Sequence, residues 1–334
     1  MEAVPPGNYS TFYYSYKINI KLKSILIKTM QEENLRLEDL LERTRVPDEK
    51  GVISKVAIIG AGVMGQGIAQ TVAESSIDVL IIEQDDKCID AAKNSLSEFI
   101  DNEIKRWAMT NSDKKAIFSR IDWERNLDHI KECDLVIEAV TEDFDLKLKI
   151  FREVDKLADD DCILISITST LSLTKLAEAT SRPDKVIGLY FLSPVPKIPV
   201  VEVVKCLHTS NETVDTIKTF VKEIRKTPVE VYEYPGFVTT RVIVPLLNEA
   251  MHILLEGVAT AKDIDTAMKL GYNFQYGPLE MADMMGLDEV LTWMETLWKT
   301  LGEPRYRACP ILRKLGKKSG EGFYKYDEHG NIIY

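Results

Sequence analysis

Lys55-Val-Ala-Ile-Ile-Gly-Ala-Gly-Val-Met-Gly-Gln-Gly67 carries the strongest fold signal in this chain. It opens with an apolar run rich in Val and Ile, which is typical of a strand buried on both faces of a parallel sheet. Three glycines follow at once, and the chain from Ile68 onward is predicted to be helical. Gly60 permits a tight turn, Gly62 lets the backbone approach a pyrophosphate, and Gly65 lets helix and strand pack closely. The order of strand, glycine turn and helix therefore predicts a dinucleotide-binding unit.

A second strand narrows the choice of dinucleotide. The segment Asp78-Val-Leu-Ile-Ile-Glu83 ends in an acid about twenty residues after the glycine turn. Such an acid accepts hydrogen bonds from ribose hydroxyls and repels a 2′-phosphate, so NAD is favoured over NADP. A doubly wound domain that has lost its ligand is the alternative. The candidate cofactor-binding residues in these two segments are Gly60, Gly62, Val63, Met64, Gly65 and Glu83.

Alternating helices and strands continue downstream of this unit, which predicts a parallel or mixed sheet covered by helices. Pro235-Gly236 then breaks the pattern, and the following residues 238–256 have the periodicity of an amphipathic helix. Helices are expected at 86–107, at 112–120, from after Glu142 to about residue 157, and at 211–225. Strands are expected at 134–138, 162–166, 185–191, 199–204 and 228–233.

The bulk composition excludes several classes of partner. The 334 residues suffice for two domains, and 45% hydrophobic with 28% charged residues is ordinary for a soluble globular protein. The net charge of −11 argues against nucleic acid as a partner. No apolar run approaches the ~20 residues that span a bilayer, so no membrane partner is expected. The five cysteines are scattered without metal-ligand spacing, which predicts reduced thiols in a cytoplasmic protein and no metal site.

Residues 1–50 differ from the rest of the chain. A tyrosine-rich stretch at 9–16 precedes an alternating lysine-rich one at 17–28, and neither has the features of a signal peptide. We interpret this segment as a flexible extension or an over-extended start, with Met30 as an alternative beginning. A transit peptide is a weaker alternative, because arginine is absent before Arg36. Residues 31–44 have the apolar spacing of a short amphipathic helix.

Several ordered motifs identify a resemblance over about residues 54–328. They include the glycine turn, Asp134-Leu-Val-Ile-Glu-Ala-Val140 with Glu142 and Lys147, Asp263-Ile-Asp-Thr-Ala-Met-Lys-Leu-Gly271, and Gly277-Pro-Leu-Glu280. The chain resembles 3-hydroxyacyl-CoA dehydrogenases, especially the short 3-hydroxybutyryl-CoA type, enzymes of fatty acid metabolism. The resemblance implies an α/β fold: a Rossmann-like doubly wound NAD-binding domain at 51–235, then an all-helical domain at 236–334. It also implies an acyl-CoA substrate, a homodimer through the helical domain, and cofactor contacts by Glu142 and Lys147.

The resemblance implies an altered chemical centre. In this family a histidine removes the hydroxyl proton of a 3-hydroxyacyl thioester as hydride leaves for the nicotinamide, and a glutamate orients that histidine. The family's catalytic serine and glutamate match Ser169 and Glu202. Its histidine position holds Tyr190, and its two asparagine positions hold Ser193 and Thr240.

Tyrosine is a poor base at this position. A free tyrosine has a pKa of ~10 against ~6.5 for histidine, so about one part in a thousand is phenolate at neutral pH. The nearby carboxylate of Glu202 would raise the pKa further, unless a cation such as Lys197 opposes it. A neutral tyrosine can still donate a hydrogen bond to a ketone oxygen. We therefore expect any surviving activity to favour reduction by NADH.

Three functions remain open. The first is an NAD(H)-dependent oxidoreductase of 3-hydroxyacyl or 3-oxoacyl thioesters, impaired or retuned by Tyr190. The second is a non-catalytic NAD- or acyl-CoA-binding pseudoenzyme with a regulatory or assembly role. The third is other chemistry on a carrier-protein-bound thioester. Five basic residues have two alternative interpretations: they contact the CoA nucleotide, or they form a solvated helix face. They are Lys105, Arg106, Lys114, Lys115 and Arg120.

Overall fold

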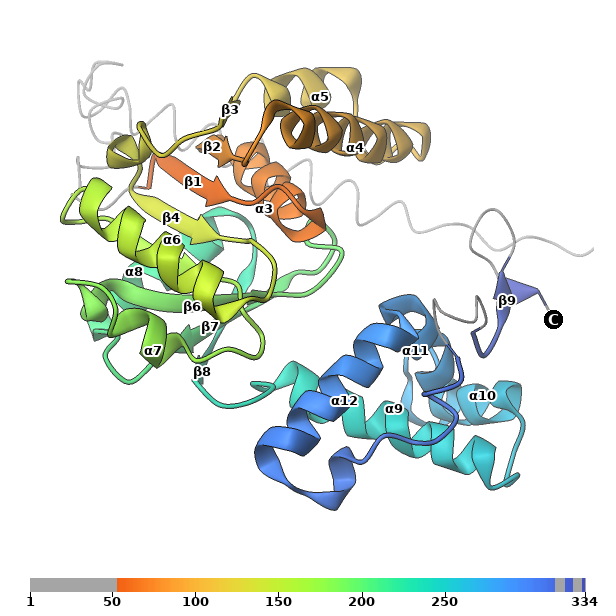
Figure 1. The fold of residues 1–334 in the computed structure, drawn as a ribbon. Coiled ribbons are helices and arrows are strands. Elements are labelled where there is room, and N and C mark those ends of the chain that lie inside the picture. The colour runs from red at the N-terminus through yellow and green to blue at the C-terminus, as the bar shows by residue number, and fades with distance from the viewer. Residues whose placement is uncertain (1–52, 316–321, 327–331, 334) are drawn as a thin grey trace, which may run out of the picture. The chain divides into compact units, whose positions relative to one another are not determined.

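The computed structural model describes residues 53–315, 322–326 and 332–333, and the helix expected at 31–44 lies outside them. Within the described residues, eight strands form one sheet in the order β3-β2-β1-β4-β5-β6-β7-β8 (Figure 1). Neighbouring strands are parallel except at β6 and β7, which are antiparallel. The sheet strands are β1 (Lys55–Ile59), β2 (Asp78–Ile82), β3 (Ile121–Glu124), β4 (Leu135–Glu138), β5 (Ile163–Ser166), β6 (Val186–Phe191), β7 (Val200–Lys205) and β8 (Thr227–Tyr232).

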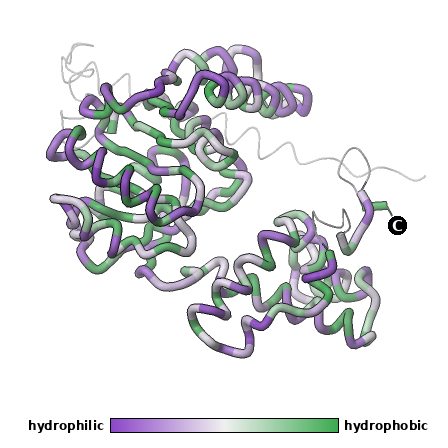
Figure 2. Tube along the Cα trace, in the orientation of Figure 1, coloured by the Kyte–Doolittle hydropathy of each residue, from purple (hydrophilic) through white to green (hydrophobic). Residues whose placement is uncertain are grey.

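Helices cover both faces of this sheet, as a doubly wound fold requires. Successive side chains of β1 enter different cores. Ile58 lies in the core that includes Ile68 of α3 (Val63–Glu74), whereas Ile59 lies in the core that includes Phe151 of α6 (Phe144–Leu157). Hydrophobic residues are concentrated along the strands, and hydrophilic ones are frequent on the covering helices (Figure 2). These helices are α3 (Val63–Glu74), α4 (Asp86–Lys105), α5 (Asn111–Phe118), α6 (Phe144–Leu157), α7 (Leu173–Ala177) and α8 (Asn211–Glu223), with 3-10 turns at Ile130–Glu132 and Pro183–Lys185.

Most elements expected from the sequence are confirmed to within two residues. The helix predicted from Ile68 begins earlier, at Val63, so Gly65 lies inside its first turn. Strand β3 was not expected, because Ile-Asp-Trp-Glu has a single fully buried side chain and lies at the edge of the sheet. The short helix α7 was also missed, since five residues carry too little periodicity to stand out.

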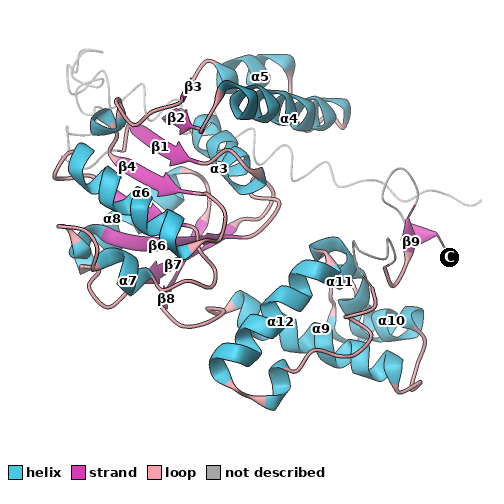
Figure 3. Cartoon of the chain, in the orientation of Figure 1, coloured by secondary structure: helices cyan, strands magenta, loops and turns pink. Residues whose placement is uncertain are grey.

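The described chain after β8 is mainly helical and ends in a short two-stranded ladder (Figure 3). Gly236 and Phe237 both have positive φ angles, of 78° and 45°, and form the turn that leads into α9. A separate core of buried residues, including Val244, Leu279 and Met294, holds these helices together. The elements are α9 (Thr239–Leu255), α10 (Ala261–Tyr272), α11 (Pro278–Met285), α12 (Leu287–Leu301), a 3-10 turn (Pro304–Tyr306), and the two-stranded ladder of β9 (Lys325–Tyr326) and β10 (Ile332–Ile333). In the part of the chain that the structure describes, every helix is too short or too polar to cross a bilayer.

Candidate active site

The glycine turn has the shape of a phosphate cradle. Gly60 has a φ of +101°, and a Cβ there would lie 2.8 Å from the carbonyl oxygen of Ala139. A Cβ on Gly65 would lie 2.0 Å from the carbonyl oxygen of Gly60, so both positions require glycine. By contrast, a Cβ on Gly62 would meet no atom within 4 Å. Gly62 therefore faces open space, as expected for a residue that a pyrophosphate approaches.

The helix that follows the turn begins without a side-chain cap. Gly62 is the N-cap of α3, and no acidic residue occupies the first turn. The backbone N–H groups of Val63, Met64 and Gly65 lie in that turn, where an α-helix supplies no internal acceptors. Free N–H groups and the positive end of the helix dipole bind anions.

Glu83 lies against this turn at the end of β2. One carboxylate oxygen accepts a hydrogen bond of 2.5 Å from the N–H of Ala61, and the other accepts from the N–H of Gln84 at 3.1 Å. The acid expected to bind ribose hydroxyls and the glycines expected to bind phosphate are thus brought together. The open side of Gly62, the uncapped helix and this carboxylate fit a dinucleotide.

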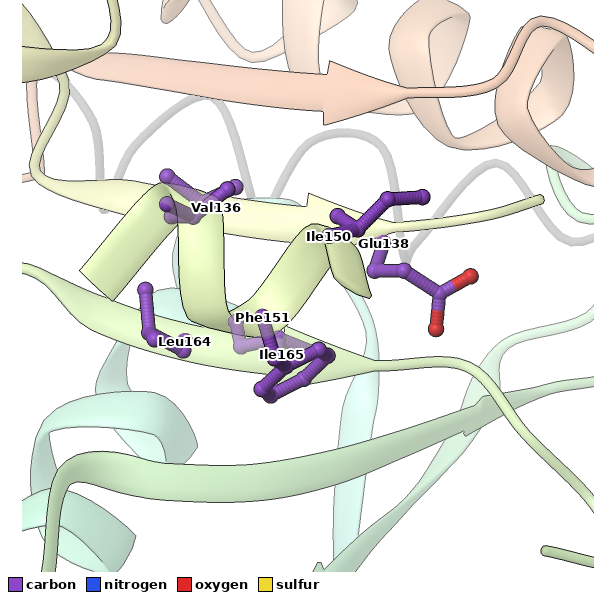
Figure 4. A pocket seen from close by; sticks show the side chains of 7 residues that line it. Val136, Glu138, Ile150, Phe151, Leu164 and Ile165 are labelled. Atoms are coloured by element: carbon purple, nitrogen blue, oxygen red, sulfur yellow. The ribbon is translucent and has the colours of Figure 1, made fainter. Parts of the chain in front are cut away.

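A buried ion-pair network stands at the ends of β4 and β5. The ammonium group of Lys147 is fully buried and donates to the Glu138 carboxylate at 2.6 Å and to the carbonyl oxygen of Val140 at 3.3 Å. The second carboxylate oxygen of Glu138 accepts from the Ser166 hydroxyl at 2.7 Å. Figure 4 shows Glu138 at the end of β4 beside the apolar side chains of Ile150 and Phe151.

Lys147 also reaches Glu142, which organises the neighbouring loop. Its ammonium lies 3.4 Å from one Glu142 oxygen. The other oxygen accepts from the N–H groups of Ser169 and Thr170, both at 3.1 Å, and from the hydroxyls of Thr168 and Thr170. Burial opposes ionisation of Glu142, but these hydrogen bonds and Lys147 outweigh it, so its pKa is lowered. The lysine therefore holds the carboxylate that fixes Ser169.

Tyr190 is 7% exposed on β6. Its hydroxyl lies 2.8 Å from the hydroxyl of Thr240 on α9, and its ring lies 5.5 Å from the ring of Phe237. Burial is the main cause that raises the pKa of Tyr190. The hydrogen bond with Thr240 opposes it, and the carboxylates of Glu202, Glu289 and Glu142 raise the pKa further. Tyr190 is therefore a neutral phenol at physiological pH.

Glu202 stands directly opposite Tyr190 in the antiparallel register of β6 and β7. Its side chain is buried, and its carboxylate accepts from the N–H of Thr239 at 2.7 Å and of Val238 at 3.2 Å. Helix α9 has no other side-chain cap. Glu202 thus binds the same helix turn that carries Thr240, the partner of Tyr190.

The remaining candidates are placed differently. Ser169 and Thr240 line one small cavity together with residues of α12: Trp293, Thr296 and Leu297. Ser193 is exposed in the loop after β6 and is not among the residues that line this cavity. Lys197 forms an ion pair of 2.9 Å with Glu103 of α4, so its charge is directed at α4.

Sequence reasoning missed two contributors. Thr170 lines the cavity beside Ser169, and its hydroxyl donates to Glu142 at 2.8 Å. Glu138 is the direct partner of Lys147. Its signal in the sequence was an acid closing an apolar strand nine residues before a lysine. Elsewhere, Lys114 and Arg120 are engaged by Asp101 and Asp78, at 2.6 and 3.1 Å.

Three features together are typical of a dinucleotide-dependent dehydrogenase: an uncapped glycine turn on a doubly wound sheet, an acid at the end of β2, and a small cavity lined by the hydroxyl residues Ser169 and Thr240. Residues 55–234 match the family model for the 3-hydroxyacyl-CoA dehydrogenase NAD-binding domain, and residues 236–326 match that for the C-terminal domain. The chain belongs to the 3-hydroxyacyl-CoA dehydrogenase family. Its cofactor is NAD, and it is an oxidoreductase of this family's type.

Individual relatives agree with this assignment. A probable 3-hydroxybutyryl-CoA dehydrogenase of Bacillus subtilis is 40% identical over 282 residues, which cover 83% of this chain and 98% of the relative. The crystal structure of (S)-3-hydroxybutyryl-CoA dehydrogenase PaaH1 from Ralstonia eutropha aligns with a TM-score of 0.76 at 39% identity, over 83% of this chain and 100% of the other. A diketoreductase that acts on dicarbonyl compounds aligns with a TM-score of 0.73 at 30% identity, over 82% and 99%.

Proposed function

We propose that this protein is an NAD(H)-dependent oxidoreductase of 3-hydroxyacyl and 3-oxoacyl thioesters whose centre is retuned toward reduction. The observation that carries the proposal is the buried, neutral hydroxyl of Tyr190 in contact with Thr240. The names of the relatives support a short 3-oxoacyl-CoA as the substrate. The diketoreductase relative supports the reductive direction on a dicarbonyl compound.

The residues of the chain take the following parts in this proposal. The glycine turn and Glu83 would hold NADH, which when bound would supply the hydride that reduces the ketone carbon of the substrate. Tyr190 donates its proton to the ketone oxygen, and Ser169 hydrogen-bonds the substrate from the loop that Glu142 and Lys147 hold. Thr240 then gives a proton to the Tyr190 phenolate and regains one from water in the cavity that it lines. Glu202 holds the turn of α9 that carries Thr240.

The opposite reaction is expected to be slow. Removing a proton from a 3-hydroxyl group requires a base, and a tyrosine with a raised pKa is almost entirely protonated at neutral pH. Loss of a positioned acid–base group costs about 10²–10⁴ in rate. Reduction escapes this cost, because the protonated form is the one that reacts.

The test is NADH consumption by the purified protein with acetoacetyl-CoA. The Bacillus subtilis relative serves as a positive control, and Tyr190→Phe serves as a matched variant that keeps the ring and removes the proton. Turnover that falls about 10²-fold or more in Tyr190→Phe supports the proposal. If the wild-type protein binds NADH without turnover, the proposal fails, and the hypothesis of a non-catalytic NAD-binding pseudoenzyme replaces it.

We also propose an NAD-binding domain at 51–235 and a helical domain at 236–334 that forms a homodimer. Exposed apolar side chains on the helical part support this, including Val242, Leu270, Tyr272 and Met284, which are 59–83% exposed. A dimer would bury such side chains. Light scattering of the protein and of a Leu270→Glu, Tyr272→Glu variant would test it. A wild-type protein that is a monomer at micromolar concentration contradicts the proposal.

A further inference from the structure

Lys226 is a buried cation whose partners are all carbonyl groups. It stands between α8 and β8 and is 7% exposed. Its ammonium donates to the carbonyl oxygens of Val195 at 2.6 Å, Ile198 at 2.8 Å and Pro196 at 3.1 Å. The three donors of the ammonium group are thereby matched by three acceptors from a single loop.

Burial of this group is costly. Taking an ammonium out of water is unfavourable unless it is fully hydrogen-bonded, and burial lowers the pKa of Lys226 accordingly. A residue that merely filled this space would be apolar. The geometry therefore points to a role in which three carbonyl groups need one shared donor.

The loop bound by Lys226 connects the two strands of the candidate site. It runs from β6, which carries Tyr190, to β7, which carries Glu202, and it includes Ser193. The N–H groups of Lys197 and Ile198 also donate to the carbonyl oxygen of Pro194, at 3.0 and 3.2 Å. The loop is thus folded back on itself around the ammonium group.

The same loop packs against the cofactor helix. A Cβ on Gly67 of α3 would lie 3.0 Å from the Cβ of Val195, so the glycine allows helix and loop to touch. Lys197 adds its ion pair with Glu103 of α4. A shift of this loop would therefore change the positions of Ser193 and of α3, whose first turn is expected to bind the phosphates of the cofactor.

We infer that Lys226 is a positioning residue that fastens the loop 193–198 between the candidate site and the cofactor helix. Its effect on turnover rests on the function proposed above, whereas its effect on the loop does not. In this role Lys226 acts through the carbonyl groups of Val195, Pro196 and Ile198.

The loop itself gives a readout that needs no activity. Lys197 is exposed at its tip, so trypsin can cleave after it once the loop opens. We expect cleavage after Lys197, identified by mass spectrometry, to become about tenfold faster or more in Lys226→Met. The control is Lys222→Met, an exposed lysine on the last turn of α8, which should change nothing. Circular dichroism confirms that each variant is folded.

Kinetics of the folded variants provide the second readout. Lys226→Met should lower kcat with acetoacetyl-CoA by about 10- to 100-fold, the order expected for a displacement of about 1 Å at a reacting centre. Lys226→Gln, which keeps two donors, should recover part of both effects. If the wild type has no turnover but Lys226→Met still opens the loop, the proposed function fails and this inference stands.

Hydrogen exchange covers the case in which Lys226→Met does not fold. In the wild-type protein, the amides of Lys197 and Ile198 should exchange far more slowly than exposed amides. Rapid exchange there would overturn the inference. So would a folded Lys226→Met variant whose loop is cleaved at the wild-type rate.

Discussion

The two directions of the proposed reaction should respond differently to pH, because they need opposite protonation states of Tyr190. An ordinary tyrosine has a pKa of ~10, and burial together with the facing carboxylates raises that of Tyr190. At pH 7 its phenolate fraction is therefore at most about 10⁻³. Each unit of pH multiplies that fraction by about ten until the pKa is reached. Oxidation of 3-hydroxybutyryl-CoA by NAD should rise about 100-fold from pH 7 to pH 9 and show no plateau there.

Reduction of acetoacetyl-CoA should stay nearly constant over the same range, because the neutral phenol is the reacting form. Initial rates measured in both directions at saturating cofactor provide the assay. Since the folded-state pKa is raised, the stability associated with Tyr190 is complete below pH ~10 and is lost as pH rises beyond it. Circular dichroism at each pH confirms that the protein remains folded. A plateau of the oxidation rate between pH 6 and 8 would show that another group is the base and would refute the reasoning.

Other predictions concern the cofactor cradle, the cap of α9 and the thiols. Gly62→Ala should leave the melting temperature unchanged but weaken NADH binding by about tenfold or more. Gly65→Ala should lower both stability and binding, because its Cβ would lie 2.0 Å from a backbone carbonyl oxygen. Equal melting curves for the two variants would contradict this. Glu202→Ala should lower the free energy of unfolding in urea by about 2–4 kcal/mol, because two backbone N–H groups lose a buried charged acceptor. A loss below about 0.5 kcal/mol would show that the cap that Glu202 provides to α9 is unimportant. Burial raises the pKa of Cys133 to about 11, whereas Cys88 is partly exposed. A disulfide reagent at pH 8 should therefore modify Cys88 before Cys133 in the native protein. Peptide mapping identifies the modified thiol, and early modification of Cys133 would contradict this order.

The sheet was predictable because each of its central strands is a short apolar run followed by a turn signal. The glycine turn added a position-specific constraint, since Gly60 and Gly65 leave no room for a Cβ. Strand β3 escaped prediction because an edge strand need not be apolar, and its pairing with β2 is a long-range property. The first turn of α3 escaped as well, because the glycines that begin it favour no single conformation.

The site was predictable residue by residue but not in its connections. The resemblance pointed to Tyr190, Glu202 and Thr240 separately, and it implied that the carboxylate of Glu202 orients the residue at the histidine position, which is Tyr190. Hydrogen-bond partners depend on side-chain length and on where α9 begins, and neither follows from spacing. The structure instead directs Glu202 to backbone N–H groups and Tyr190 to a threonine hydroxyl. The role of Lys226 was hidden for the same reason, because its acceptors are main-chain carbonyls about thirty residues away.

These connections link the proposed proton donor to the helical part of the chain. One turn at the start of α9 supplies both the N–H groups that bind Glu202 and the hydroxyl that binds Tyr190. A buried carboxylate and a buried phenol that face each other across a sheet are each satisfied by this turn, so neither depends on the other for its hydrogen bonds. If the turn moved, both groups would lose a partner together. Replacement of Glu202 should therefore change Tyr190 in two ways, directly by removing a carboxylate that raises its pKa and indirectly through α9. Because of the indirect path, its effect should not be additive with that of replacing Thr240.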